Sequence, residues 1–117
     1  MKDKIFEKAI KWTQSRGFSE IKANTTDFET PVAFSRQNGA DPVIPDMTAK
    51  LHGAKSYIEI VHKEEDRQFL ISKWKLLSIM ASRKGGKLYL LAAKGQKAFA
   101  DNIVREYDLH NAKVVSI

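Results

Sequence analysis

The chain has 117 residues, of which 43% are apolar and 29% are charged, with a net charge of +6 and no cysteine. This length is typical of one domain, and the balance of apolar and charged residues is that of a folded protein rather than a disordered one. The lack of cysteine excludes disulfides, thiol catalysis and thiolate metal sites. The positive charge favours a polyanionic partner, most often nucleic acid, although a merely soluble protein can also carry it.

The hydropathy of the chain gives no indication of membrane insertion. The longest uncharged apolar run, from Leu88 to Ala93, has the length of a strand and is far shorter than the ~20 residues of a membrane helix. The first residues, from Met1 to Glu7, alternate in charge and lack the apolar centre of a signal peptide. We therefore expect a cytoplasmic protein that forms a single domain over residues 1–117.

Hydrophobic spacing predicts a helix at the start of the chain. Ile5, Ala9 and Trp12 recur at helical intervals, and Gly17 is suited to end the helix. A strand of uncertain register is predicted between residues 18 and 28, where apolar residues and threonines are frequent.

A long loop precedes a predicted hairpin. All three prolines of the chain lie between Thr30 and Asp46, and a loop of this length is usually functional or disordered in so small a domain. The hairpin has arms over residues 46–51 and 56–63, joined by a turn that contains glycine. Acids at 64–66 then favour the start of a helix that runs to about Ser82.

The remaining elements alternate between strand and helix. A strand over 87–93, a helix over 96–107 and a strand over 113–117 complete the order α-β-β-β-α-β-α-β. The last five elements imply right-handed crossovers and some parallel pairing. The predicted class is therefore α/β with a mixed sheet.

Two acids lie on neighbouring arms of the predicted hairpin. Asp46 follows Pro45 at the start of the first arm, and Glu59 lies between Ile58 and Ile60 in the second. Two such carboxylates can converge on one divalent cation, and their hard oxygen atoms suit Mg²⁺ or Mn²⁺. Each acid also has a plainer interpretation, Asp46 as a turn residue and Glu59 as a solvent-facing residue of an alternating strand.

The order of elements, the Pro-Asp pair at 45–46 and the apolar-Glu-apolar sequence at 58–60 resemble the PD-(D/E)XK nuclease superfamily. Its compact members, such as archaeal Holliday-junction resolvases, are about this long, and the resemblance covers nearly the whole chain. It implies a restriction endonuclease-like three-layer fold, with a central mixed sheet flanked by helices. It also implies that Asp46 and Glu59 bind the metal and that Glu7 contributes an acid from the first helix, with a solvated helix charge as the favoured alternative for Glu7.

The chain departs from the superfamily at Val61, where the motif has a lysine that positions the attacking water. Three lysines are candidates to replace it. Lys63 follows on the same predicted strand face, Lys50 lies on the neighbouring arm, and Lys73 lies on the following helix, where some superfamily members carry a relocated lysine.

Lys73 has independent support from its position on the helix. At 100° per residue it falls between Leu77 and Met80, inside the apolar arc. A lysine there must snorkel to solvent, pair with an acid such as Glu59, or serve a site. We expect Lys73 to replace the missing lysine, with a snorkelling side chain as the alternative.

Positive charge is concentrated in one part of the sequence, because residues 67–100 contain eight Lys/Arg and no acid. The glycine-containing turn at 83–87 and the helix start at 94–97 are suited to contact a phosphate backbone. Such contacts supply affinity rather than sequence specificity, and a solvated basic surface is the alternative. The residues predicted to bind nucleic acid are Lys75, Arg83, Lys84, Lys87, Lys94 and Lys97, with Arg36 from the long loop.

Other motifs are weak. The three histidines lack the spacing of metal ligands, and we expect them at the surface or in turns. Neither a phosphate-binding loop nor a dinucleotide fingerprint occurs. Trp12 and Trp74 are predicted to be core residues, whereas Tyr57, beside Glu59, is the aromatic residue least expected in the core.

Three functions are compatible with these features. The first is a Mg²⁺-dependent endonuclease that hydrolyses DNA phosphodiesters, with branched DNA as one candidate substrate. The second is a catalytically inactive module of the same fold that binds nucleic acid, which Val61 favours. The third is a protein-interaction domain. Because small resolvases commonly act as dimers, the resemblance also implies a homodimer.

Overall fold

The computed structural model describes residues 2–35 and 42–117. Within these residues the chain forms three helices and five strands in the order α-β-β-β-α-β-α-β, which confirms the predicted α/β class and element order. In the same part of the chain, no helix is long and apolar enough to cross a bilayer. The elements are α1 (Lys2–Ser15), β1 (Ser19–Ala23), β2 (Met47–Leu51), β3 (Ala54–Ile60), α2 (Arg67–Arg83), β4 (Gly85–Ala92), α3 (Lys97–Glu106) and β5 (Ala112–Ser116).

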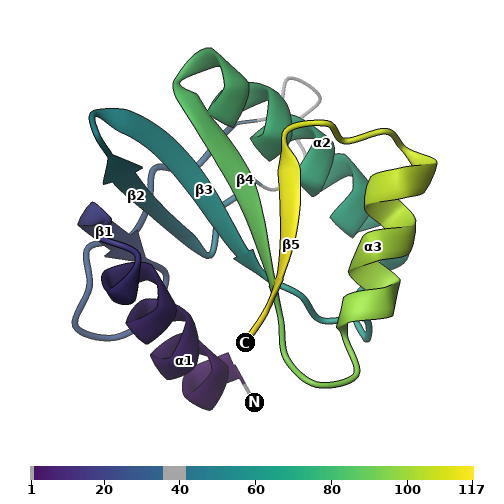
Figure 1. Cartoon of the computed structure of the whole chain (residues 1–117), viewed down its shortest axis with the longest axis horizontal. Helices are drawn as coiled ribbons and strands as arrows, with labels where there is room; N and C mark the ends of the chain where they lie inside the picture. Colours follow the sequence, from purple (N-terminus) through teal and green to yellow (C-terminus); the bar gives the residue numbers. More distant parts are fainter. Residues whose placement is uncertain (1, 36–41) are drawn as a thin grey trace.

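The strands form one mixed sheet in the order β1-β2-β3-β4-β5. The first three strands pair antiparallel, and β3, β4 and β5 pair parallel through crossovers that contain α2 and α3. The last residues of the parallel strands and the first residues of β2 lie at the lower end of the sheet in Figure 1. We call this end of the strands the site end, and we call the opposite end, where the turn connects β2 to β3, the turn end.

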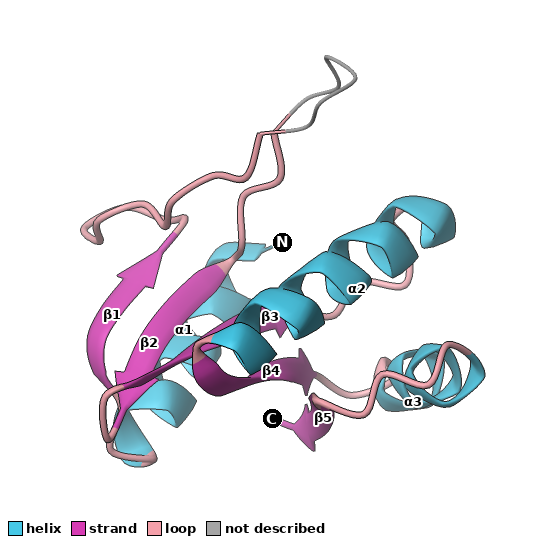
Figure 2. Cartoon of the chain, turned by 90° about the horizontal axis from the view of Figure 1, so that it is seen from above, coloured by secondary structure: helices cyan, strands magenta, loops and turns pink. Residues whose placement is uncertain are grey.

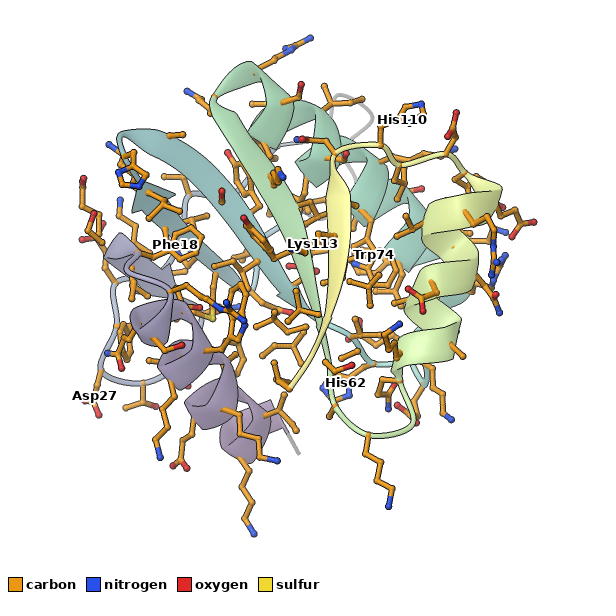
Figure 3. The ribbon with its side chains drawn as sticks, in the orientation of Figure 1. Phe18, Asp27, His62, Trp74, His110 and Lys113 are labelled. Atoms are coloured by element: carbon orange, nitrogen blue, oxygen red, sulfur yellow. The ribbon has the colours of Figure 1, made fainter. Side chains whose placement is uncertain are left out.

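Apolar side chains pack on both faces of the sheet. On one face, Phe6 of α1 packs in a buried cluster with Met47 and Ile58. On the other face, Trp74 of α2 packs in a second cluster with Leu88 and with side chains of α3. Figure 2 shows the sheet between α1 and the other two helices, and Figure 3 shows Trp74 near α3. Helices therefore flank the sheet on both sides, and Trp74 is a core residue as predicted.

Local sequence explains where α2 begins and which side chains it buries. The Asp66 side chain accepts a hydrogen bond from the backbone N–H of Gln68 at 3.2 Å, which caps the first turn. The buried face of the helix includes Lys73, Trp74 and Leu77. Lys73 therefore points toward the sheet rather than toward solvent.

Two predictions about β3 are wrong. The strand ends at Ile60, so Lys63 does not continue its face. Beyond Ile60 the chain turns toward the loop before α3, where the backbone N–H of Lys63 donates to the side chain of Gln96. Tyr57 is only 2% exposed, because α2 and the ring of Phe34, 5.9 Å away, cover this face of the strand.

Candidate active site

Asp46 and Glu59 face each other at the site end, where pairing between β2 and β3 stops. Met47 pairs with Ile58, so the preceding Asp46 lies opposite Glu59. The backbone N–H of Asp46 donates to Glu59 Oε2 at 2.7 Å, and the backbone N–H of Ile60 donates to Asp46 Oδ2 at 2.9 Å. Each carboxylate thus accepts a hydrogen bond from a backbone N–H on the opposite arm of the hairpin. Together the two bonds fix the positions of both side chains.

Both carboxylates are buried. Asp46 is 5% exposed and Glu59 is 1% exposed. Glu59 belongs to the face of β3 that carries the buried side chain of Tyr57. The alternative that Glu59 faces solvent is therefore wrong, because α2 covers this face of the strand.

Lys73 reaches this pair from α2. Its Nζ atom lies 3.1 Å from Glu59 Oε1, and the residue is only 8% exposed. Of the possibilities left open for Lys73, pairing with Glu59 is observed, and the alternative of a snorkelling lysine is wrong. One cation and two carboxylates therefore share a small buried volume.

The other two candidate lysines lie elsewhere. Lys50 Nζ lies 3.6 Å from Glu20 Oε1, toward the turn end of β2. Lys63 Nζ donates to the backbone carbonyl of Gly95 at 3.2 Å, in an exposed position. Lys73 is thus the candidate that the structure brings to Glu59.

The surroundings of Glu59 disfavour its negative charge. Burial, together with the charge of Asp46, raises the pKa of Glu59 to about 8, although Lys73 opposes the shift. Glu59 therefore exchanges a proton near neutral pH, unlike an ordinary carboxyl group. A positive charge placed between Glu59 and Asp46 relieves the repulsion that keeps this proton bound.

Glu7 lies on α1, which packs on the face of the sheet opposite to α2. It is exposed on α1 and lines a hollow together with Thr26, Asp27 and Phe28. In residues 2–35 and 42–117, no group of three or more histidine, cysteine or acidic residues is arranged to hold a metal. The role that the resemblance implies for Glu7 remains a prediction.

The histidines partly match their predicted places. His52 lies in the exposed turn between β2 and β3, and His110 is exposed before β5. His62 differs, because it is half-buried after β3, with Nδ1 3.9 Å from Glu64 Oε1. Figure 3 shows His62 at the site end of the sheet.

The predicted nucleic-acid contacts divide between the two ends of the sheet. Lys94 and Lys97 follow β4 at the site end, whereas the turn end carries the basic residues around the start of β4. All six described members of the set are exposed. They are Lys75, Arg83, Lys84, Lys87, Lys94 and Lys97; Arg36 lies outside the described residues.

Two of these side chains already have partners. Lys97 Nζ lies 2.8 Å from Asp101 Oδ2 within α3, and Lys75 Nζ lies 4.6 Å from the centre of the Tyr107 ring. The others expose their charge without an ion pair to any described residue. The basic residues that lie close together in the sequence are therefore spread over both ends of the sheet and over α2.

The sequence analysis missed two lysines that belong to a basic hollow. Lys22 and Lys55 lie with Lys50 and Lys84 around this hollow at the turn end. Because these residues come from separate segments, the charge distribution along the chain does not reveal them. The alternation of β1, β2 and β3 identifies them only once the register of the strands is known.

Comparisons with protein-family models, with curated proteins and with solved structures found no match. The chemistry of the candidate site is therefore inferred from its geometry and from the resemblance of the sequence.

Proposed function

We propose that this protein is a Mg²⁺-dependent endonuclease-like protein that hydrolyses DNA phosphodiesters, with branched DNA as a candidate substrate. The observation that carries the proposal is the convergence of Asp46, Glu59 and Lys73. Two acids from a hairpin and a lysine from the next helix form one buried cluster. This is the residue set that the resemblance implies for catalysis, with Lys73 in place of the lysine missing at position 61.

The architecture supports the finer assignment to a restriction endonuclease-like fold. An antiparallel β1-β2-β3 meander is followed by a helical crossover to the parallel β4. The candidate acids lie at the start of β2 and near the end of β3, which is where the resemblance expects them. The α1 helix packs on the opposite face of the same hairpin.

The chemistry of the donor set fits a divalent cation. Asp46 and Glu59 supply hard carboxylate oxygens, and Mg²⁺ is usually held by one or two carboxylates, with waters and substrate phosphates completing its shell. The repulsion that raises the pKa of Glu59 to about 8 is the repulsion that a bound cation offsets. When bound, such a metal activates water and stabilises charge that develops on a phosphoryl group.

The chain's own groups then have separate tasks. Asp46 and Glu59 would hold the cation, and their hydrogen bonds to backbone amides keep the two carboxylates in position. The Lys73 ammonium, 3.1 Å from Glu59 Oε1, holds the attacking water beside the acids and offsets negative charge on the phosphate. The exposed basic residues at both ends of the sheet supply affinity for the backbone.

The test is a cleavage assay with Mg²⁺ and with Mn²⁺ on supercoiled plasmid, single strands and a synthetic four-way junction. We expect the native protein to cleave at least one of these substrates. Asp46→Asn, Glu59→Gln and Lys73→Gln should each lower the rate by at least about a hundredfold. Circular dichroism and thermal melting establish that each variant is folded.

Lys63→Gln is the matched control, because it removes one lysine that lies away from the acids. It should cleave at nearly the native rate. Full activity of Lys73→Gln, or loss of activity in Lys63→Gln, would contradict the assignment of the lysine. If the native protein binds DNA but cleaves no substrate with either cation, the inactive binding module that Val61 favours replaces the enzyme.

A further inference from the structure

The basic hollow is a feature separate from the candidate active site. It lies at the turn end and encloses about 320 Å³. Its cationic lining comes from four segments: Lys22 from β1, Lys50 from β2, Lys55 from β3 and Lys84 from the end of α2. The backbone brings these lysines together although 62 positions separate the first and last in the sequence.

The register of the sheet explains why the lysines share one face. Lys50 pairs with Lys55, and Lys22 pairs with Thr48, which precedes Lys50 by two residues. Directly paired residues point to the same face, as do residues two apart along one strand. Lys55 also pairs with Gly85, so the preceding Lys84 lies beside it. This is the face on which α2 packs against β3 and β4.

The local carboxylates balance only part of this charge. Lys50 pairs with Glu20 at 3.6 Å, and Lys22 pairs with Glu29 at 3.0 Å. Lys55 and Lys84 have no ion pair with any acid in the described segments.

The positive charges of the lysines around the hollow also repel one another. Burial lowers the pKa of Lys55, and the charges of Lys22, Lys84 and Lys50 lower it further. Cations that repel one another around a concave surface favour the binding of an anion.

The distance between the hollow and the acids indicates that the hollow suits a phosphate of a nucleic-acid strand. Asp46 and Lys50 lie four residues apart along the same hairpin arm, which spans about 13 Å in a strand. Phosphates of one DNA strand recur every ~3.4 Å along the helix axis while turning around it, so this span corresponds to only a few nucleotides. A strand whose phosphate lies at Asp46 and Glu59 therefore has further phosphates within reach of the hollow.

We infer that the hollow formed by Lys22, Lys50, Lys55 and Lys84 binds phosphate groups of a nucleic-acid backbone, at a second contact a few nucleotides from the carboxylate pair. The spacing rests on the proposed function, whereas binding at the hollow does not require cleavage. The exposed Lys87 lies near the same end and extends the basic surface along β4.

The test measures binding without cleavage. The fluorescence anisotropy of a short labelled duplex is followed over a range of salt concentrations, with EDTA present to remove divalent cations. Lys55→Gln/Lys84→Gln should weaken binding about tenfold or more and reduce the salt slope by about 1–2, because each lost phosphate contact contributes ~0.9. Lys55→Arg/Lys84→Arg keeps both charges and should bind nearly as the native protein does.

The matched control is Lys8→Gln/Lys11→Gln, which removes two exposed charges from α1 on the other side of the sheet. Its salt slope should remain close to the native value. If the Lys55/Lys84 variant matches this control in both affinity and slope, the inference is wrong. This comparison does not depend on cleavage. A protein that cleaves no substrate, but whose binding weakens in the Lys55/Lys84 variant, therefore contradicts the proposed function and not the inference about the hollow.

A second arm separates nucleic acid from a small phosphorylated ligand. Pyrophosphate is titrated while the amide resonances of the hollow are followed by NMR. We expect weak shifts that the labelled duplex displaces. Tight pyrophosphate binding that the duplex does not displace would assign the hollow to a small molecule and overturn the nucleic-acid contact.

Discussion

At the scale of single residues, Glu59 is held by two groups, the Lys73 ammonium and the backbone N–H of Asp46. Removing one partner of a buried ion pair leaves an uncompensated charge and typically costs about 3–5 kcal/mol. At a pH above 8, where Glu59 is ionised, Lys73→Met should therefore lower the free energy of unfolding by about 3 kcal/mol. The loss should be smaller at acidic pH, because Glu59 then takes up a proton.

Urea denaturation at the two pH values measures this effect. The double variant Glu59→Gln/Lys73→Met removes both charges and should recover most of the stability that the single variant loses. Equal losses for Lys73→Met at both pH values would show that the charge of Glu59 is not what Lys73 stabilises.

The raised pKa of Glu59 also makes stability depend on pH. The pKa of this group is about 8 in the folded protein and 4.5 in its ordinary state, so between these values the folded chain holds a proton that the unfolded chain releases. The contribution of Glu59 is fully present below pH 4.5 and is lost as the pH rises toward 8. The stability of Glu59→Gln should therefore rise relative to that of the native protein through this window.

This comparison uses urea denaturation of both proteins at a series of pH values. Using the difference between the two proteins removes the contribution of other titrating groups. Parallel stability profiles would show that the folded environment does not shift the ionisation of Glu59.

At the scale of elements, the sequence predicts what depends on local spacing. The burial of Lys73 follows from helical periodicity, and the start of α2 follows from the acids that precede it. Local spacing does not predict where β3 ends. Lys63 leaves the strand because its backbone N–H binds Gln96, which is 33 residues away in the sequence. The burial of Tyr57 likewise depends on Phe34, in a loop whose path has no periodic pattern.

The candidate site and the hollow also differ in whether local sequence spacing predicts them. The pairing of Lys73 with an acid is predictable because helical spacing buries the lysine, and a buried charge requires a partner. The basic hollow is not predictable in this way, because its lysines meet only through strand register and a crossover. Charge segregation along the chain therefore identified Lys84 but not its neighbours Lys22 and Lys55.

The parallel pairing of β3 with β4 requires a residue without a side chain at position 86. A Cβ atom on Gly86 would lie 2.0 Å from the backbone carbonyl oxygen of Lys55, a position that a backbone atom cannot easily leave. Gly86→Ala should thus separate the strands and lower the free energy of unfolding by more than about 3 kcal/mol, above the usual cost of overpacking. Urea denaturation measures the loss.

Gly17→Ala is the control for this prediction. A Cβ atom on Gly17 meets no atom within 4 Å, and the substitution strains only the backbone, which has φ of +83°. It should cost only about 1 kcal/mol. If Gly86→Ala costs no more than Gly17→Ala, the close approach of the two strands does not constrain the fold.

At the scale of the whole molecule, positive charge exceeds negative charge, with a net value of +6. Exposed lysines and arginines carry much of this charge, whereas Asp46 and Glu59 are buried at the site end together with Lys73. A polyanion is thus attracted to the surface as a whole, and Asp46 and Glu59, when both are ionised, outweigh the charge of Lys73 and repel it locally. A bound cation removes that repulsion, so binding of metal and of nucleic acid should reinforce each other.

This arrangement predicts that a divalent cation stabilises the entire fold. A ligand that binds only the folded state stabilises it by RT ln(1 + L/Kd), where L is the free ligand concentration, so the melting temperature rises with ligand concentration. Mg²⁺ or Mn²⁺ should therefore raise the melting temperature of the native protein, and the increase should be larger above pH 8, where Glu59 no longer holds its proton. Differential scanning fluorimetry with each cation, followed by EDTA, measures the increase and its reversal.

Asp46→Asn and Glu59→Gln should abolish this stabilisation, because each removes one of the two carboxylate ligands. Lys63→Gln, whose side chain binds the carbonyl of Gly95 away from the acids, should retain it. A melting temperature that saturating Mg²⁺ and Mn²⁺ leave unchanged at both pH values would show that Asp46 and Glu59 do not hold a metal. The pair would then serve only to join β2 to β3 through its two backbone hydrogen bonds, with Lys73 balancing the buried charge.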